Sequence, residues 1–253
     1  MTDDELIARI LYRDGQMLIV DKPAGIPVHG GFGGGETLDQ HFPALQFGLP
    51  NPPQLAHRLD KDTSGCLVLG RHRRSIRELG EMFASQKIAK TYLAVVVGQM
   101  PEDEGVIDAP LAKQVHDKRS WWMKVDPSGQ PSVTEYRVVA RGDKLSVVDL
   151  FPRTGRTHQL RVHTAFLGCP IVGDGVYGGD LARGVDKRLH LHARHISVPL
   201  YKKKPVIEAE APVPEHMTRL LGRLGVMDET GWLRHVPRPA AVEPVEVPET
   251  VQP

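Results

Sequence analysis

The amino-acid sequence predicts an α+β protein built on a largely antiparallel mixed sheet with flanking helices. Runs of β-branched and aromatic residues outnumber segments with helical periodicity, and they follow one another through turns more often than through helices. The chain has 253 residues, of which 40% are hydrophobic and 25% charged. A chain of this length and composition can fold around a substantial core.

The first elements are a short helix within residues 1–10 and a strand over residues 17–23 that ends at a proline turn. The glycine-rich segment GGFGGG, residues 30–35, comes next. It lacks the GK[ST] sequence and the strand–helix setting of phosphate-binding loops, so we expect a flexible loop.

A strand is predicted over CLVLGR, residues 66–71, and a helix over residues 75–86. Ser75 and Glu78 have the S-x-x-E spacing of a capping box and are expected to begin that helix. Its apolar residues recur at helical spacing and are expected to face the core. They are Ile76, Leu79, Met82 and Phe83.

The middle of the chain is predicted to be mainly β structure. We expect a strand at 91–98, a hairpin over 115–139 that turns at D-P-S-G, and a strand at 144–152. Turn residues and then a helix are expected over 152–168, with Gly168 ending the helix. The residues expected to face inward from this helix are Leu160, Thr164 and Leu167.

The last predicted strand, residues 190–199, places His190 and His192 on one face. An H-x-H pair can be half of a metal site, but no third ligand is suggested nearby, so we interpret both as structural or phosphate-facing histidines. Residues 236–253 are mostly Pro, Val and Glu and are expected to be a disordered tail.

Composition narrows the class of protein. Cys66 and Cys169 both lie in apolar stretches and form no disulfide framework or zinc pattern, so they are expected in the core of a protein in the reducing cytoplasm. No run of 18 apolar residues and no secretion signal is present. The net charge is only +1, but basic residues cluster between Arg58 and Lys90 and again between Arg153 and Arg161, which favours RNA or DNA as a partner.

The most unusual stretch is HRLDKDTSGCLVLGR, a polar loop between a His–Arg pair and an apolar run. Asp60 and Asp62 have the spacing of the first ligands of a calcium loop, but Arg71 stands where the closing Glu is required. The same D-x-D spacing occurs in aspartyl-phosphate enzymes, but no hydrophobic strand precedes it here. A third interpretation is one carboxylate, flanked by Arg58, acting on a nucleic acid. A polar turn without function is the alternative.

Four segments in order resemble the successive motifs of the RluA-type pseudouridine synthases: DKPAGIPVHG, HRLDKDTSGCLVLGR, KTYLAVVVG and PRTGRTHQLRVH. The similarity extends from about Ile10 to Pro212. It implies the pseudouridine synthase catalytic fold and an RNA uridine isomerase, in which the bond from uracil to ribose is broken and the base is rejoined through its carbon 5.

The resemblance also implies residue roles. Asp60 would be the essential carboxylate, Tyr92 the tyrosine that packs on the base, and Arg161 the arginine that pairs with Asp60. Leu160 would close the base pocket, and Arg58 would take the space of a flipped nucleotide.

Elementary chemistry supports these roles. Breaking the bond at the anomeric carbon develops oxocarbenium-like charge, which an ionised carboxylate stabilises or attacks. A guanidinium opposite Asp60 would favour the charged form in a dry pocket. Nucleophilic attack by Asp60 and deprotonation of the ribose both stay open, and Tyr92 could move a proton in either route.

The expected partner is a stem-loop in structured RNA, either rRNA or tRNA, whose target uridine is extruded for reaction. Lys90 and Arg156, together with Lys87 and Arg73, are candidate phosphate contacts. Trp121 and Trp122 could stack on bases or pack on the predicted hairpin.

No metal and no cofactor are required by an isomerisation, and no membrane contact is expected. We expect a monomer with one catalytic domain over residues 1–235 and no small RNA-binding module ahead of it, because the first family motif begins near Leu11. A catalytically silent RNA-binding protein of the same fold is the alternative function.

Overall fold

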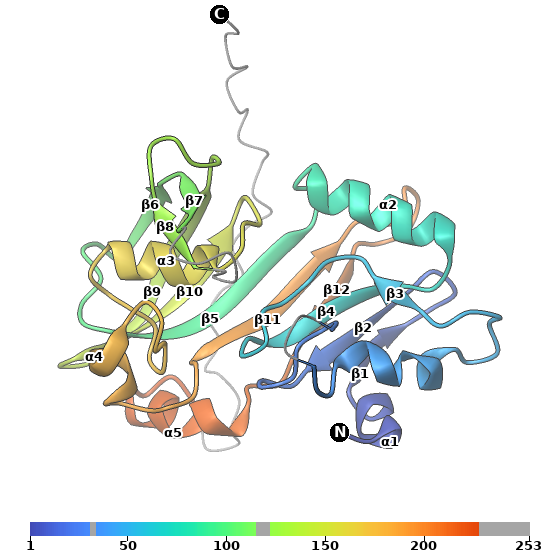
Figure 1. The fold of residues 1–253 in the computed structure, drawn as a ribbon, viewed down its shortest axis with the longest axis horizontal. Coiled ribbons are helices and arrows are strands. Elements are labelled where there is room, and N and C mark those ends of the chain that lie inside the picture. The colour runs from blue at the N-terminus through green and yellow to red at the C-terminus, as the bar shows by residue number, and fades with distance from the viewer. Residues whose placement is uncertain (31–33, 115–121, 228–253) are drawn as a thin grey trace, which may run out of the picture.

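The computed structural model describes residues 1–30, 34–114 and 122–227. A ten-stranded sheet forms its body, with the strand order β1-β2-β4-β11-β5-β10-β9-β6, β3 beside β4 and β12 beside β11 (Figure 1). These strands are β1 (Ile10–Arg13), β2 (Met17–Lys22), β3 (Gln54–Leu55), β4 (Ser64–Gly70), β5 (Ala89–Val97), β6 (Glu104–Asp108), β9 (Val133–Arg141), β10 (Leu145–Pro152), β11 (Leu191–Val198) and β12 (Ile207–Glu210). The predicted α+β class with a largely antiparallel sheet is confirmed.

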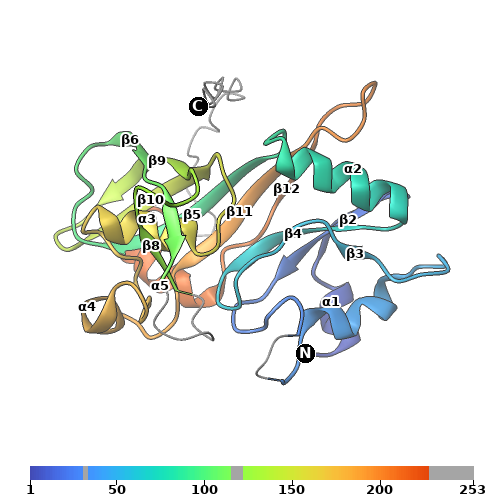
Figure 2. The same cartoon turned by 45° about the horizontal axis from the view of Figure 1, so that its top comes forward.

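Helices cover both faces of the sheet. They are α1 (Asp3–Ile7), the 3-10 helix η1 (Leu38–Leu45), α2 (Arg73–Ala84), α3 (Gln159–Phe166), α4 (Gly179–Arg183) and α5 (Glu215–Arg223). Two short strands, β7 (Leu111–Lys113) and β8 (Met123–Val125), form a separate sheet. In both views α2 lies on one side of the β2–β4 region, and α1 and η1 lie on the other (Figures 1 and 2).

The sequence of the central strand β5 is almost continuously apolar because both of its faces are covered. Ala94 and Val96 pack into the core cluster that contains Leu160 of α3, whereas the alternate residues Leu93 and Val95 pack into the cluster that contains α5. Because successive side chains of a strand point to opposite faces, a strand covered on both faces needs apolar residues throughout. The run TYLAVVVG is thus a buried strand, as predicted.

The junction of β4 with β11 is a parallel pair, and it depends on one glycine. Gly65 has φ +107°, and a Cβ at this position would lie 2.2 Å from the carbonyl oxygen of Ala193. A side chain cannot be accommodated there, so the glycine of the TSG sequence is required for the two strands to meet.

His192 is buried at this junction, and His190, two residues earlier, is also buried. His192 Nδ1 lies 2.9 Å from Ser64 Oγ, and its Nε2 lies 3.3 Å from the carbonyl oxygen of Ala211. Burial lowers the pKa of His192 to about 4, so the ring is neutral. The structural interpretation of these histidines is confirmed.

The predicted start of α2 is wrong. The N-cap is His72, whose Nδ1 accepts a hydrogen bond from the Ser75 backbone N–H at 3.3 Å, so Ser75 is the third helical residue. Glu78 instead accepts a hydrogen bond from Arg74 one turn away. The imidazole replaces the expected serine cap because its ring nitrogen can accept the same orphan N–H.

The predicted hairpin over residues 115–139 is also wrong. The D-P-S-G turn does form, with the Gly129 N–H donating to the Asp126 carbonyl at 2.8 Å. However, β8 before the turn pairs with β7, whereas β9 after it pairs with β6 and β10. Residues 115–121, including Trp121, and the predicted tail at 236–253 lie outside the described residues.

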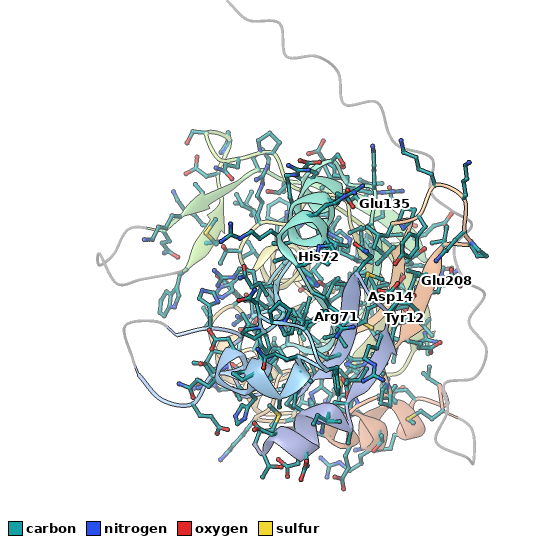
Figure 3. The ribbon with its side chains drawn as sticks, turned by 90° about the vertical axis from the view of Figure 1, so that its right-hand side faces the viewer. Tyr12, Asp14, Arg71, His72, Glu135 and Glu208 are labelled. Carbon is teal, nitrogen blue, oxygen red and sulfur yellow. The ribbon has the colours of Figure 1, made fainter. Side chains whose placement is uncertain are left out.

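Arg71, the residue that spoils the calcium spacing, has a structural role. Its guanidinium is buried and donates to the carbonyl oxygens of Asp14 at 2.5 Å and Gln46 at 2.9 Å. The Asp14 side chain in turn accepts hydrogen bonds from Tyr12 and from Tyr201, so this cluster fastens the β1–β2 turn (Figure 3). The end of the polar motif is therefore part of the core.

Candidate active site

A pocket of about 390 Å³ opens where the loop before β4, the end of α2, the start of β5 and the β10–α3 segment meet. Its volume lies within the range typical of small-ligand sites. All seven site residues expected from the sequence line it: Arg58, Asp60, Lys90, Tyr92, Arg156, Leu160 and Arg161. The chain thus brings together residues that are up to about 100 positions apart.

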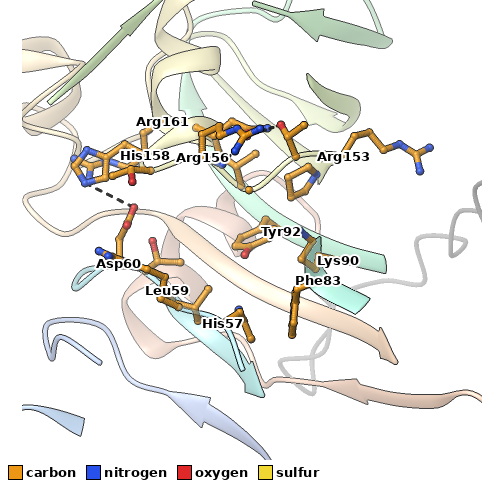
Figure 4. Close-up of a pocket in the computed structure, with 18 of the residues that line it drawn as sticks. His57, Leu59, Asp60, Phe83, Lys90, Tyr92, Arg153, Arg156, His158 and Arg161 are labelled. Carbon is orange, nitrogen blue, oxygen red and sulfur yellow. Dashed lines mark hydrogen bonds and ion pairs between the residues drawn. The ribbon is translucent and has the colours of Figure 1, made fainter. Parts of the chain in front are cut away.

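Asp60 lies on a tight turn at the mouth of this pocket (Figure 4). The Thr63 N–H donates to the Asp60 carbonyl at 3.2 Å, which closes the turn. The carboxylate is 21% exposed, and its Oδ2 lies 3.9 Å from Nε2 of His158, shown as a dashed line in Figure 4. Within the described residues it makes no shorter polar contact, so it is available to a ligand.

Lys22 supports the Asp60 turn from below. This side chain is fully buried, and its Nζ donates to the carbonyl oxygens of Pro23, Ile26 and Lys61 at 2.7, 2.8 and 2.9 Å. Burial lowers the pKa of Lys22 to about 8, while the charges of Asp62, Asp60 and Asp21 oppose that shift. Lys22 therefore fixes the loop and adds positive charge behind the carboxylate.

The expected ion pair between Arg161 and Asp60 is wrong in this structure. The Arg161 guanidinium forms a two-pronged pair with the buried Asp174, with Nε–Oδ2 at 2.7 Å and Nη2–Oδ1 at 2.9 Å. A bidentate contact with a planar carboxylate matches the guanidinium geometry best, and Asp174 is held in place by the N–H groups of Val176 and Tyr177. The Asp60 charge still acts on Arg161 at longer range.

Tyr92 and Leu160 form the apolar wall that was expected. Tyr92 packs against two core clusters, and Leu160 is 7% exposed. Burial, followed by the nearby Asp60 charge, raises the pKa of Tyr92, so its phenol is protonated at neutral pH. The wall offers a flat aromatic surface beside a carboxylate.

A second wall consists of His57, Phe83 and Lys90. The rings of His57 and Phe83 stack with centroids 4.3 Å apart, and His57 Nε2 accepts the Val68 N–H at 3.0 Å. Burial lowers the pKa of His57 to about 3 and that of Lys90 to about 8. His57 is therefore a neutral part of the wall and not an acid or base.

The basic residues around the pocket differ in what holds them. Arg58 is exposed and makes no side-chain hydrogen bond or ion pair within the described part of the chain. Arg156 is exposed and donates to the Pro131 carbonyl at 3.3 Å, whereas Arg153 forms a bidentate pair with Glu135. Arg58 and Arg156 thus have charge to offer to a polyanion.

Other expected groups lie elsewhere or await a test. Arg73 lies at the opposite end of α2, away from this pocket, and Lys87 is exposed after that helix. Trp122 is 47% exposed, and base stacking by this side chain stays a prediction. In the described ranges no three His, Cys, Asp or Glu side chains gather as metal ligands, and no helix there has the length and apolarity needed to span a bilayer.

Sequence reasoning missed Lys22, His158, Asp174 and Tyr177. A lysine that ends the apolar run MLIVDK is an available signal, because a charged residue on a strand buried on both faces needs a specific partner. Asp174 and Tyr177 lie in the short segment GDGVYGG, which carries no regular pattern. Only the tertiary fold brings that segment beside α3.

Comparisons with known proteins agree with this geometry. Residues 16–166 match the family model described as RNA pseudouridylate synthase. An uncharacterized RNA pseudouridine synthase of Zymomonas mobilis is 42% identical over 216 residues, which cover 85% of this chain and 98% of that protein. Ribosomal large subunit pseudouridine synthase C of Vibrio parahaemolyticus is 36% identical over 229 residues, covering 86% of this chain and 69% of that protein.

Solved structures give the same result. The human protein RNA Pseudouridylate Synthase Domain Containing 4 superposes with a TM-score of 0.73 at 29% identity, covering 88% of this chain and 95% of that one. Human RNA Pseudouridylate Synthase Domain Containing 1 has a TM-score of 0.72 at 28% identity, with coverages of 95% and 93%. The two likenesses extend over nearly the whole of each solved chain.

Proposed function

The chain belongs to the RNA pseudouridylate synthase family and is an RNA-modifying isomerase. We propose that it isomerises a uridine of large-subunit rRNA and that Asp60 is the essential group. The observation that carries the proposal is an ionisable carboxylate, free of strong partners, at the mouth of a pocket walled by Tyr92 and Leu160. A catalytically silent RNA-binding protein is not favoured, because the whole expected set of residues lines one pocket.

The first chemical step would break the bond between uracil N1 and the anomeric carbon. The carboxylate of Asp60 would face the positive charge that develops on the ribose, either as nucleophile or as base toward the neighbouring ribose carbon. Lys22 supplies positive charge that acts favourably on Asp60, and the longer-range attraction of Arg161 for Asp60 is largely offset by the Asp174 carboxylate that Arg161 binds. A bond from carbon 5 to the anomeric carbon then forms, carbon 5 loses its hydrogen as a proton and N1 takes up a proton, so no net redox change occurs.

The pocket walls would keep the detached base in place. Tyr92 offers a ring on which uracil can stack, and because its pKa is raised its phenol keeps its proton and can donate a hydrogen bond. Leu160 excludes water, which would otherwise intercept the ribose. Arg58 is exposed and uncommitted at the rim, which suits the space that a flipped nucleotide leaves.

The rRNA substrate is proposed from relatives that are named ribosomal large subunit pseudouridine synthase C. Mapping pseudouridine in rRNA and tRNA from cells that lack the protein tests it: one missing site in large-subunit rRNA is expected, and a missing site in tRNA would move the substrate there. Catalysis by a monomer, a cytoplasmic location and a catalytic domain over residues 1–235 stay predictions.

Asp60→Asn is the decisive variant. It should abolish tritium release from an rRNA transcript labelled at carbon 5 of uridine, while RNA binding and thermal stability stay close to wild type. The carboxylate makes no close hydrogen bond, so the substitution removes none from the fold. Asp62→Asn on the same turn is the matched control and should stay active. Full activity of D60N would refute the assignment.

A further inference from the structure

His158 has an unusual backbone for its place in the fold. It is the N-cap of α3, with φ 54° and ψ 16°, in the left-handed region that side chains with a Cβ rarely adopt. Its side chain makes no capping hydrogen bond, so helix capping does not account for this conformation. The ring instead lines the pocket and faces Asp60 (Figure 4). Such backbone conformations persist where the surrounding structure fixes them, often at functional sites.

The hydrogen bonds of Tyr177 determine which nitrogen of His158 carries the proton. The Tyr177 hydroxyl oxygen accepts the Met123 backbone N–H at 2.9 Å, and it lies 2.8 Å from His158 Nδ1. Within the described residues Nδ1 is the acceptor that this hydroxyl can reach, so we assign the hydroxyl hydrogen to the bond with Nδ1. In the neutral ring the proton is then on Nε2, the nitrogen that faces Asp60 Oδ2 at 3.9 Å.

The neutral ring is consistent with its surroundings. Burial lowers the pKa of His158. The negative charges of Asp60 and Asp174 oppose this shift, whereas the positive charges of Arg161 and Arg58 add to it. Asp60 is thus the carboxylate that an Nε2–H donor in this place can reach.

A rigid set of contacts holds Tyr177 itself. Its backbone N–H donates to Asp174 Oδ1 at 3.0 Å, and Asp174 is clamped by Arg161. The Arg161 guanidinium also lies 5.1 Å from the centre of the Tyr177 ring. Arg161 therefore reaches Asp60 through a chain of side chains, Asp174, Tyr177 and His158, and not by direct contact.

We propose that His158 is the residue that positions the Asp60 carboxylate, and that Tyr177 fixes the ring tautomer that this requires; the proposal rests on the proposed function. The Nε2–H donates to Oδ2 once a uridine occupies the pocket, and no proton is transferred. The present separation is about 1 Å longer than a direct hydrogen bond. Contacts of this kind often shorten when substrate binds, and Asp60 lies on a partly exposed turn that can make the movement.

A matched pair of substitutions at His158 tests the role. Gln and Met are nearly the same size and are both unbranched at Cβ, but only Gln can place an N–H where Nε2 lies. H158M should lower the single-turnover rate of tritium release by about 10- to 100-fold, the factor that corresponds to one hydrogen bond to a charged group, with KM for RNA nearly unchanged. H158Q should recover most of that loss.

Tyr177→Phe separates positioning from packing, because it keeps both rings. In the wild-type background it should lower the rate, since Nδ1 can then hold the proton instead of Nε2. In the H158Q background, where no tautomer exists, it should have no further effect, and a double-mutant cycle measures that difference.

The outcomes separate the two claims. If wild type releases no tritium, the proposed function fails and this inference with it. If wild type is active, D60N is inactive and H158M reacts at the wild-type rate, only the positioning role is overturned. Equal rate losses in H158Q and H158M, or additive effects of Y177F, would likewise overturn it by assigning His158 to packing of the left-handed turn.

Discussion

Two buried cations lie near Asp60, and they are held in opposite ways. Lys22, at the end of β2, donates to three neutral carbonyl oxygens, and no carboxylate of the described residues hydrogen-bonds its ammonium. Arg161, on α3, is clamped by the carboxylate of Asp174. Burial lowers the pKa of Lys22 to about 8. Burial is also the largest single effect on Arg161, but the hydrogen bonds and charge of Asp174, together with the charges of Asp60 and Tyr177, outweigh it and raise the pKa of Arg161.

The different partners of Lys22 and Arg161 give them different roles: Lys22 contributes charge, and Arg161 contributes a fixed geometry. Carbonyl oxygens stabilise an ammonium without cancelling its charge, so Lys22 can act on Asp60 across the turn that it supports. Arg161 and Asp174 together are nearly neutral, and what they give the site is a fixed position for Tyr177 and the start of α3. Removing the Asp174–Arg161 pair and removing Lys22 should therefore lower the free energy of unfolding by different amounts.

The largest effect is expected from Asp174→Asn. It leaves the Arg161 guanidinium buried without a counter-charge, which should lower the free energy of unfolding by about 3–5 kcal/mol. Urea denaturation measures this, with Asp180→Asn on the exposed part of α4 as the control. A loss below about 1 kcal/mol would mean that Arg161 has turned to Asp60, which would weaken the comparison.

Lys22→Met is expected to cost less. Three carbonyl oxygens lose the same donor, which outweighs the desolvation that the variant avoids, so the free energy of unfolding at pH 7 should fall by about 1–3 kcal/mol. Lys61→Met is the matched control, because only the carbonyl of Lys61 takes part and its side chain is exposed. If K22M and K61M were equally stable, Lys22 would not be the support of the Asp60 turn.

The pH dependence of the same variant sharpens the contrast. The pKa of Lys22 is lowered to about 8 in the folded chain from the ordinary lysine value of 10.5. Between these values the unfolded chain binds more protons, so the stability of wild type should rise with pH relative to K22M, by at most about 1.4 kcal/mol per pH unit. Below pH 8 the difference should be constant. Urea titrations of both proteins from pH 7 to 10.5 measure it, and a flat difference across that window would contradict a charged, buried Lys22.

The smallest effect moves the comparison to the surface, onto one loop. Arg156 is held by a carbonyl and should still bind a phosphate, whereas Arg153 is committed to Glu135. Arg156→Gln should make the slope of log K for RNA against log salt shallower by about 0.7–0.9. Arg153→Gln should leave that slope unchanged. Filter binding at several salt concentrations measures both slopes. Equal slopes for the two variants would contradict the expectation that an arginine held by a carbonyl binds phosphate while one paired with a carboxylate does not.

Much of the fold could be predicted because its strands are covered on both faces and therefore read as apolar runs. The pairing partner of each strand was harder to predict. The segment before the D-P-S-G turn has strand character, but nothing local to it specifies that β8 pairs with β7 instead of β9. The start of α2 was missed because a histidine ring replaced a serine as the cap.

The residues of the site could be predicted as a set, but not their contacts. Each of the seven belongs to a motif whose own turn or strand places it on the pocket. The partner of Arg161 could not be predicted, because Asp174 lies 13 residues further on in an irregular segment. The same holds for Tyr177 and His158, whose relation exists only after α3 has packed beside residues 174–177.

Because β4 pairs in parallel with β11, which comes much later in the chain, the sheet around Asp60 cannot be completed until late in translation. Asp60 is synthesised about 130 residues before the strand that completes its surroundings, an interval on the order of 10 s during translation. Throughout that time β4 and β5 lack the strand that lies between them in the sheet, so a chain interrupted before β11 should be inert toward RNA. Synthesis of β11, and not of the motif that contains Asp60, is therefore the step that we expect to complete the active site.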